Sequence, residues 1–365
     1  MGDGDIRAGD SPSGRLKELD GWRAVSVLAV LVYHVTSFQH PRFLTAHPHL
    51  HGVVAHGGLL GVKVFFVISG FVICRLLLRE EQRFGAISLR GFYLRRAFRI
   101  LPPFAAYLAA VAILRLLGWI DQPWSAFFAA AAFLYDLNLF PPSWFVGHTW
   151  SLAIEEQFYL ILPSLWLLTR KPWRVHVFPA LFVFLVAWNI AAVFTGPSLI
   201  VPAVTRQGFA CICWGVLMAI FESRARRIGA AVPGWIVALA AVVLLVRPVR
   251  TGGLAESLYE PLFVAPAIGL LLAHSLEHRG WLHSLLCSRP MQAAGLTSYG
   301  IYLWQQLFTA PKVDYASPSG RMLGYLLPLL LVLIPLSYFF VEKPAIRLGR
   351  TLAGDSLRRA PDAMA

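Results

Sequence analysis

An arginine and a histidine share one long apolar stretch near the start of the chain. Arg23 opens the stretch and His34 follows eleven residues later. On an α-helix, eleven residues make about three turns and about 16 Å of rise, so both side chains point the same way. Ionisable groups inside apolar segments are costly and are functional candidates, and histidine titrates near neutrality, which suits a general base. A structural reading, in which a polar neighbour satisfies His34 at an interface, stays open but is weakened by Arg23.

Three arginines follow the second apolar stretch. Spacings of three and four residues place Arg99 on one helix face with Arg96 and Arg95. Guanidinium groups bind phosphate oxygens in a forked geometry, so the cluster predicts a cytoplasmic phosphate-binding site. Anchoring against anionic lipid is an equal alternative for the cluster taken alone.

Two adjacent glutamates interrupt the apolar stretch that begins after His148. Glu155 and Glu156 point about 100° apart on a helix, so at least one should face the interior of a bundle. One could orient and charge-stabilise an imidazole, and the other could pair with an arginine or with Lys63. A pair of glutamates at an interfacial helix start is the plainer alternative. We expect His148 and Ser151 at the outer mouth of the bundle.

The composition indicates which kind of protein positions these groups. The chain has 365 residues, of which 57% are hydrophobic and 14% are charged. Soluble domains are about half apolar and a quarter charged, and disordered chains need low hydrophobicity, so both classes are excluded. The net charge of +13 is typical of basic loops in a membrane protein and does not require nucleic acid. We therefore predict an all-α integral membrane protein, a bundle of about ten transmembrane helices.

The apolar stretches suggest the topology, since a helix needs about 20 residues to cross the hydrocarbon core. Ten stretches meet this length: 21–38, 58–78, 101–118, 149–168, 176–194, 203–221, 230–246, 258–276, 291–310 and 322–341. A shorter one, 125–140, predicts a re-entrant or interfacial segment. With the N-terminus inside, inner segments hold 24 of the 32 lysines and arginines, which places both termini in the cytoplasm. We expect a polar N-terminus (1–18), a transmembrane domain (19–345) and a polar tail (346–365).

The cysteines and histidines do not predict a metal site. The four cysteines match neither a disulfide framework nor a zinc signature and are interpreted as packing residues: Cys74, Cys211, Cys213 and Cys287. Five histidines crowd the first outer loop, but their spacing is irregular and no Cys, Asp or Glu joins them, which favours a solvated loop over a zinc site: His40, His47, His49, His51 and His56. Three more histidines are expected at the inner interface: His274, His278 and His283.

Six segments, taken in order, resemble the membrane acyltransferase family 3, whose members modify surface glycans, lipooligosaccharides and some macrolides. They are 19–23 with His34, 61–71, 95–100, 149–159, 298–304 and 341–344. The resemblance implies transfer of an acyl group, commonly acetyl, from cytoplasmic acyl-coenzyme A to a hydroxyl of a saccharide, a glycolipid or a glycosylated small molecule. It implies no tightly bound cofactor, no nucleic acid, and a place in the lipid bilayer of the bacterial inner membrane.

The same resemblance implies roles for individual residues. Arg96 and Arg99, with Arg95 beside them, would hold the phosphates of coenzyme A, and Arg23 would help to position the donor or the histidine. His34 would be the catalytic histidine, either as a base or as a transient acyl carrier. Their position in the apolar stretch, and not the resemblance, adds glutamates 155 and 156 to the catalytic candidates. The candidates for substrate binding are Lys63, Ser69, His148, Trp150, Ser151, Tyr159, Trp304 and Gln305.

Two positions depart from the family pattern. Gln305 stands where the family often has a histidine, so His148 is a candidate substitute for that histidine. Lys63 stands where many relatives have aspartate, which would favour an anionic donor or a glutamate partner. The main alternative function is a transporter, because ten helices with buried charges also describe a carrier. Carriers often show inverted repeats, which this sequence lacks, and a phosphate clamp is unexpected in them.

Overall fold

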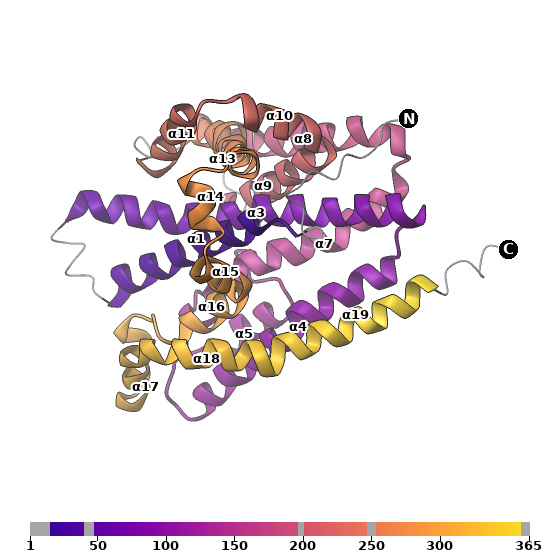
Figure 1. Ribbon diagram of the computed structural model, residues 1–365. Helices are drawn as coiled ribbons and strands as arrows, with labels where there is room; N and C mark the ends of the chain where they lie inside the picture. Colours follow the sequence, from indigo (N-terminus) through magenta and orange to yellow (C-terminus); the bar gives the residue numbers. More distant parts are fainter. Residues whose placement is uncertain (1–14, 40–46, 196–200, 247–252, 359–365) are drawn as a thin grey trace.

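The computed structural model describes residues 15–39, 47–195, 201–246 and 253–358, and nearly all of these are helical (Figure 1). Within the described residues, the one β pairing is an isolated antiparallel bridge between Ile120 and Tyr315. The all-α class predicted from composition is therefore confirmed. His40 and the outer parts of both termini lie outside the described residues.

Most helices of the first part of the chain are long, and two short ones lie among them. They are α1 (Lys17–His34), α3 (Pro48–Phe84), α4 (Leu89–Leu116), α5 (Trp124–Ala131), α6 (Trp144–Gly147), α7 (Thr149–Leu168), α8 (Arg174–Phe194) and α9 (Ala203–Ile220). A π-helical turn, Val35–Gln39, follows α1 directly. Because α3 begins at Pro48, histidines 49, 51 and 56 belong to a helix, and the loop predicted there is wrong for these three positions.

The second half of the chain is more broken. Its helices are α10 (Glu222–Ala231), α11 (Gly234–Val246), α12 (Gly253–Tyr259), α13 (Ala265–Glu277), α14 (Trp281–Leu286), α15 (Arg289–Leu296), α16 (Ser298–Trp304), α17 (Pro318–Leu323), α18 (Leu330–Ser337) and α19 (Lys343–Arg358). A π turn, Glu260–Val264, joins α12 to α13. A 3₁₀ turn, Gln305–Leu307, continues α16.

Within the described residues, six helical stretches are long and apolar enough to cross a membrane. They are Gly52–Phe84, Leu89–Leu116, Lys171–Phe194, Ala203–Ile220, Ser257–Glu277 and Pro318–Gly354. Each overlaps one of the predicted spans. The pair α10 and α11 makes a seventh only if the two form one span across a bend of 103°, which lies at Pro233. The short 125–140 segment contains only the eight-residue α5, which is too short to cross.

The remaining predicted spans do not meet the length and hydropathy of a span, so the count of ten is not confirmed. α1 and α7 are single helices of 18 and 20 residues, but their charged residues lower the hydropathy. The predicted span 291–310 is not one helix, because the chain breaks at Thr297 and tightens to a 3₁₀ turn at Gln305. Hydropathy alone does not register such breaks.

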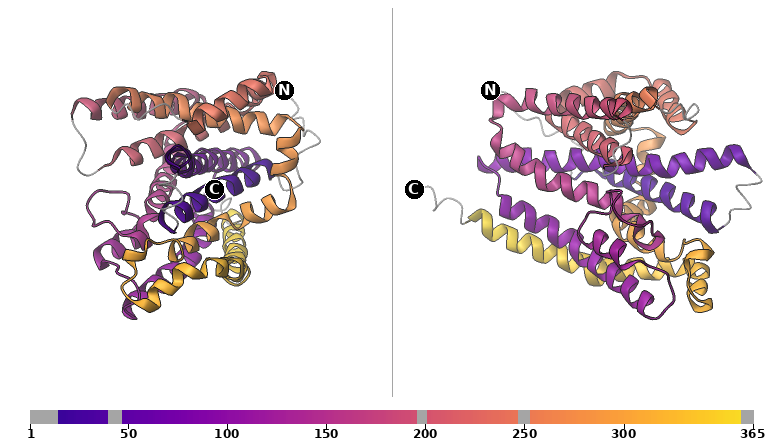
Figure 2. Two further views of the ribbon diagram at one scale, coloured as in Figure 1. Left: turned by 90° about the vertical axis from the view of Figure 1, so that its left-hand side faces the viewer. Right: turned by 180° about the vertical axis from the view of Figure 1, so that it is seen from behind.

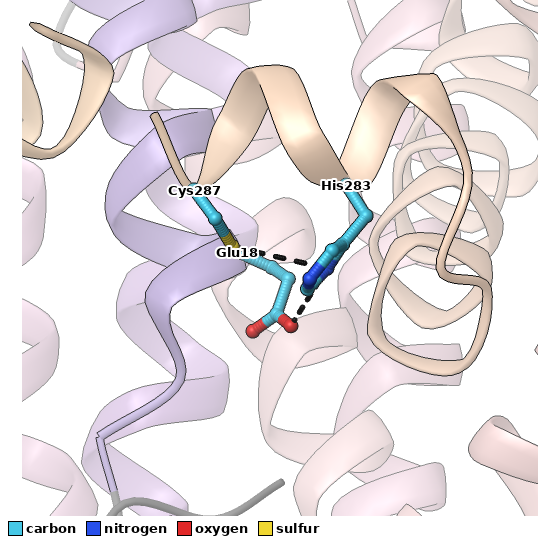
Figure 3. A group of neighbouring side chains, drawn as sticks. All are labelled: Glu18, His283 and Cys287. Carbon is cyan, nitrogen blue, oxygen red and sulfur yellow. Dashed lines mark hydrogen bonds and ion pairs between the residues drawn. The ribbon is translucent and has the colours of Figure 1, made fainter. Parts of the chain in front are cut away.

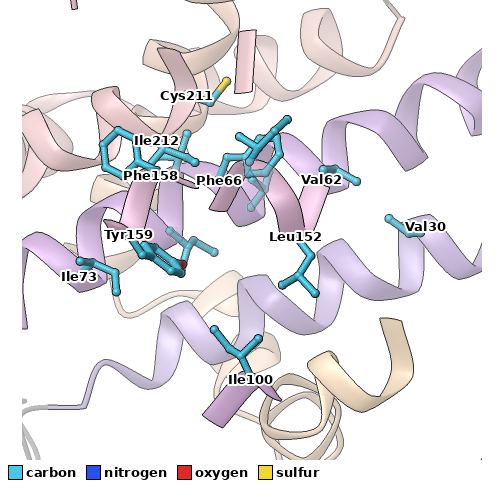
Figure 4. Packing of buried hydrophobic residues seen from close by; sticks show 14 of the residues in the cluster. Val30, Val62, Phe66, Ile73, Ile100, Leu152, Phe158, Tyr159, Cys211 and Ile212 are labelled. Carbon is cyan, nitrogen blue, oxygen red and sulfur yellow. The ribbon is translucent and has the colours of Figure 1, made fainter. Parts of the chain in front are cut away.

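The helices lie in layers (Figures 1 and 2). One side consists of α8, α10, α11 and α13, and the middle layer consists of α1, α3, α7 and α9. On the other side, α4 and α19 run side by side. Apolar side chains of the middle helices interdigitate with residues of α4 (Figure 4), including Phe66, Leu152, Ile212 and Ile100. The middle layer therefore carries much of the core together with Arg23, His34, Ser69 and Glu155, while Arg96 and Arg99 reach it from α4.

Glycines set the two closest helix crossings. A Cβ at Gly70 of α3 would overlap the carbonyl oxygen of Ile212, and one at Gly215 of α9 would overlap that of Val67. Only glycine lets two backbones approach so closely. In the same way, Gly295 of α15 lies against the backbone of α1 at Asp20. These contacts fix α1 and α3, the two helices that carry Arg23, His34 and Ser69.

Candidate active site

A strongly basic cavity opens at the end of the bundle where α1 begins. It has a volume of about 490 Å³, and six arginines line it together with Asp20: Arg15, Arg23, Arg75, Arg79, Arg99 and Arg350. An adjoining cavity of about 380 Å³ shares Arg15, Arg99 and Arg350 and adds Lys343 and Arg347 from α19. We call these two cavities together the basic chamber.

Part of this positive charge is compensated by carboxylates. Arg15 and Arg23 both reach Asp20, at 2.5 and 3.4 Å, and Arg75 pairs with Glu222 at 3.0 Å. Within the described residues, Arg99 makes no salt bridge, although it lines both parts of the basic chamber. A guanidinium that is exposed to a cavity and unpaired is well placed to bind an anion.

A narrow cavity of about 100 Å³ continues from the basic chamber into the middle layer, and we call it the neck. Arg23 and Arg99 line both spaces, and Arg96 joins them in the neck. The guanidinium of Arg96 lies 5.1 Å from the centre of the Tyr159 ring, a cation–π distance. The neck therefore presents three arginines around a small space.

Glu155 is the acidic group of the neck. Its carboxylate accepts hydrogen bonds from Ser69 at 3.2 Å and from the Tyr159 hydroxyl at 3.0 Å. Neither glutamate of the pair hydrogen-bonds an imidazole in the described residues. Oε1 of Glu156 is buried without a hydrogen-bond partner. The expectation that a glutamate orients a histidine is therefore not met, because the Glu155 carboxylate accepts hydrogen bonds from the hydroxyl groups of Ser69 and Tyr159 instead.

Beyond the neck lies a third cavity of about 350 Å³, which contains two histidines and which we call the imidazole chamber. His34 stands edge-on to Trp144, with 5.2 Å between ring centres, and His148 stands 5.3 Å from Tyr302. Neither ring nitrogen of the buried His148 has a hydrogen-bond partner among the described residues. The fully buried Gln305 lies beside His34.

The three spaces adjoin through shared side chains. Arg23, Val72 and Arg99 line both the basic chamber and the neck, while Val62 and Tyr302 line both the neck and the imidazole chamber. α1 forms one wall throughout, with Arg23 near its start and His34 at its last residue. The helix widens to a π turn immediately after His34, a distortion that is frequent at functional sites.

Comparison with known proteins shows to which family this chain belongs. A family model described as an acyltransferase domain matches residues 16–342, which is most of the chain. The chain belongs to the acyltransferase 3 family. No solved structure matches it.

Three named relatives illustrate what this chain is similar to. The chain is 26% identical to "Peptidoglycan O-acetyltransferase OatA" of Listeria monocytogenes over 91% of its own length and 56% of the relative. It is 27% identical to "Putative peptidoglycan O-acetyltransferase YrhL" of Bacillus subtilis, over 89% of its own length and 54% of the relative. It is also 27% identical to "Putative O-acetyltransferase SACOL0978" of Staphylococcus aureus, over 89% of its own length and 56% of the relative. The chain spans about half the length of these relatives.

Five residues singled out from the sequence line none of the three spaces of this acyltransferase 3 protein: Arg95, Lys63, Glu156, Trp304 and Gln305. Arg95 turns to Glu80, with 2.6 Å between the charged groups. The Trp304 indole donates to Ser337 at 3.1 Å. Lys63 is buried and paired with Glu260, so the expected partnership with Glu155 or Glu156 is wrong. The long Lys63 side chain instead connects α3 to the π turn that follows α12.

The other predicted residues do lie around these spaces. Ser69, Ser151 and Tyr159 line the neck, and Trp150 and His148 line the imidazole chamber. Sequence analysis missed the contribution of α3 and α19 to the basic chamber. Arg75 and Arg79 lie four residues apart at the end of α3, a one-face spacing that could have signalled them. Tyr302, which joins neck and imidazole chamber, was noted only as part of a motif.

Proposed function

We propose that this protein transfers an acyl group, commonly acetyl, from acyl-coenzyme A to a hydroxyl of a saccharide or glycosylated acceptor. The observation that carries the proposal is the run of adjoining spaces from Arg99, which makes no salt bridge within the described residues, to His34. Membership of the acyltransferase 3 family supports the reaction type. Relatives named as peptidoglycan O-acetyltransferases support a saccharide acceptor.

The basic chamber suits the phosphate-bearing end of the donor. Coenzyme A has anionic phosphates at one end and a thioester at the end of a thin, flexible arm. Six arginines line the larger part of the basic chamber, and forked guanidinium groups match phosphate oxygens. The neck joins the basic chamber to the imidazole chamber and lies where the arm would pass. Along α1, Arg23 and His34 are separated by about 16 Å, which the arm has to span.

His34 would serve as the base at the far end. Its neutral imidazole takes the proton of the acceptor hydroxyl while the hydroxyl oxygen attacks the thioester carbonyl carbon. The carbon–sulfur bond breaks, and the departing thiolate takes the proton back from the imidazolium. The unpartnered ring nitrogens of His148 offer a second contact for the acceptor. A route in which His34 carries the acyl group would use the same placement.

The orientation in the membrane follows from charge. We place the basic chamber in the cytoplasm of a bacterial cell, at the inner membrane, because lysines and arginines gather in alternate loops. Both termini are then cytoplasmic and the chain crosses ten times. Under this topology α1 and α7 cross inside the bundle with their charged residues protected, and the α10–α11 and α15–α16 segments cross as broken helices.

Turnover by the purified protein tests the reaction. We expect acetyl-coenzyme A to release free thiol in the presence of a saccharide acceptor, and His34→Ala to reduce that rate by about 10²- to 10⁴-fold, the range for a lost acid–base group. His176→Ala, which removes an exposed histidine from α8, is the matched control and should keep the wild-type rate. Equal rates in wild type and His34→Ala, or no thiol release at all, would overturn the proposal and favour a transporter.

The acceptor is found by comparing cells. Mass spectrometry of surface glycans and secreted metabolites, with and without the gene, should reveal one pool that loses an acyl group. An unchanged acyl pattern in both pools contradicts a saccharide acceptor.

A further inference from the structure

A carboxylate, an imidazole and a thiol meet outside the three spaces, where the start of α1 lies against α14 (Figure 3). Glu18, His283 and Cys287 place one donor atom each within 4.8 Å of one another. Nδ1 of His283 lies 3.2 Å from Oε1 of Glu18 and 3.8 Å from Sγ of Cys287. These are three of the side chains that bind zinc in proteins.

The separations of the imidazole nitrogen from the other two donor atoms are compatible with a tetrahedral ion. Zinc bonds are about 2.0–2.1 Å to nitrogen, 2.0–2.2 Å to oxygen and 2.3 Å to sulfur, so tetrahedral angles separate nitrogen from oxygen by about 3.4 Å and from sulfur by about 3.6 Å. The observed separations of 3.2 and 3.8 Å lie close to these values. An ion would therefore need little movement of either helix.

The local structure holds the three groups together. His283 lies within α14, and Cys287, four residues later, is the C-terminal cap of that helix. Both side chains therefore face the same way. Glu18 arrives from the first turn of α1, and its side chain is only 8% exposed. Close packing of Gly21 against the backbone at Leu286 fixes α1 at this point.

A guanidinium shares the cluster. Nη1 of Arg279 lies 3.3 Å from the Glu18 carboxylate and 2.9 Å from Nε2 of His283. The Arg279 side chain is 56% exposed, so it can turn into water at small cost. A Zn²⁺ ion would then be neutralised by the carboxylate and by the Cys287 thiolate, whose proton passes to solvent.

We propose that Glu18, His283 and Cys287 form a zinc site with three protein ligands and a fourth position for water. Bound zinc ties the first turn of α1 to α14. Asp20 and Arg23, which line the basic chamber, lie within the next turn of α1. The site is independent of the acyl-transfer reaction and differs from the expectation, drawn from the sequence alone, that no metal binds.

Cobalt is the probe of choice, because four-coordinate cobalt absorbs strongly and its thiolate bond gives a separate near-ultraviolet band. We expect the purified, tag-free full chain to bind one Co²⁺ with both signals, and Zn²⁺ to displace it. Cys287→Ser should remove the thiolate band and His283→Ala should abolish tight binding. Cys213→Ser, on α9, and His278→Ala, outside the cluster, are matched controls that should leave both signals unchanged.

A gain-of-binding variant guards against misfolding as an explanation. Arg279→Gln removes the guanidinium that competes with the metal for Glu18. Co²⁺ binding should tighten by about two- to fivefold, a change that corresponds to the free energy of one half-exposed ion pair. Absence of a thiolate band in the wild type, or its persistence in Cys287→Ser, would refute the site. Weaker binding in Arg279→Gln would also count against it.

Discussion

Arg99 and Arg95 lie four residues apart on α4 and face different surroundings, which makes them a matched pair. Arg99 lines the neck and both parts of the basic chamber without a salt bridge in the described residues. Arg95 pairs with Glu80 and lines none of these spaces. If the basic chamber holds the phosphates of the donor, Arg99→Ala should weaken donor binding, while Arg95→Ala should change it little.

The size of the effect follows from the contacts available. A hydrogen bond to a charged group contributes about 1.5–3 kcal/mol, so loss of the Arg99 guanidinium should raise KM for acyl-coenzyme A by about 10- to 150-fold. Arg95→Ala should change KM by less than about threefold, since its charge is already shared with Glu80. kcat should fall less than KM rises, because Arg99 holds the end of the donor remote from the thioester.

Initial rates of thiol release at varied donor concentration measure both constants. Arg99→Lys keeps the charge but loses the planar fork, so its KM should fall between wild type and Arg99→Ala. An increase in KM that is as large in Arg95→Ala as in Arg99→Ala would refute the assignment of the basic chamber. Equal KM values in all the variants would do the same.

Three further outcomes are expected. Lys63→Met removes the buried cation that pairs with Glu260, a change that costs about 3–5 kcal/mol, so the thermal midpoint in detergent should drop. Lys63→Met with Glu260→Gln should recover most of the loss, and no recovery would contradict the pairing. Gly215→Leu should abolish a monodisperse fold, because the side chain would overlap the α3 backbone at Val67; normal elution in size-exclusion chromatography would disprove that contact. Trp144→Ala should widen the imidazole chamber and raise the rate with butyryl- relative to acetyl-coenzyme A, and an unchanged ratio would place acyl selection elsewhere.

The sequence predicted features that repeat at helical spacing. Arg96 and Arg99 share a face of α4, and both line the neck; Arg23 and His34 both line the run of spaces along α1. In each case the residues belong to one helix, so the 3.6-residue period alone relates them. The all-helical class could be predicted from composition for a similar reason, because that prediction does not require knowing which segments contact one another.

Contacts between distant segments could not be predicted in this way. Lys63 and Glu260 are 197 residues apart, and Glu18 and His283 are 265 apart, so no local pattern connects them. The contribution of α19 to the basic chamber was missed because its residues read as a polar tail. Helix breaks at Thr297 and Pro233 depend on packing that hydropathy does not record.

The glycine-mediated crossings determine which parts of this protein can move. α3 cannot slide along α9, nor α1 along α15, because backbone oxygens occupy the space that a shift would require. These four helices therefore act as a stationary frame that holds Arg23, His34 and Ser69 at constant separation. If the route for substrates opens and closes, we expect the opposite wall to move, where α16 is a single short helix ending in a 3₁₀ turn and carries Tyr302. Spectroscopic labels placed on α16 would report that motion, whereas labels on α9 would stay still.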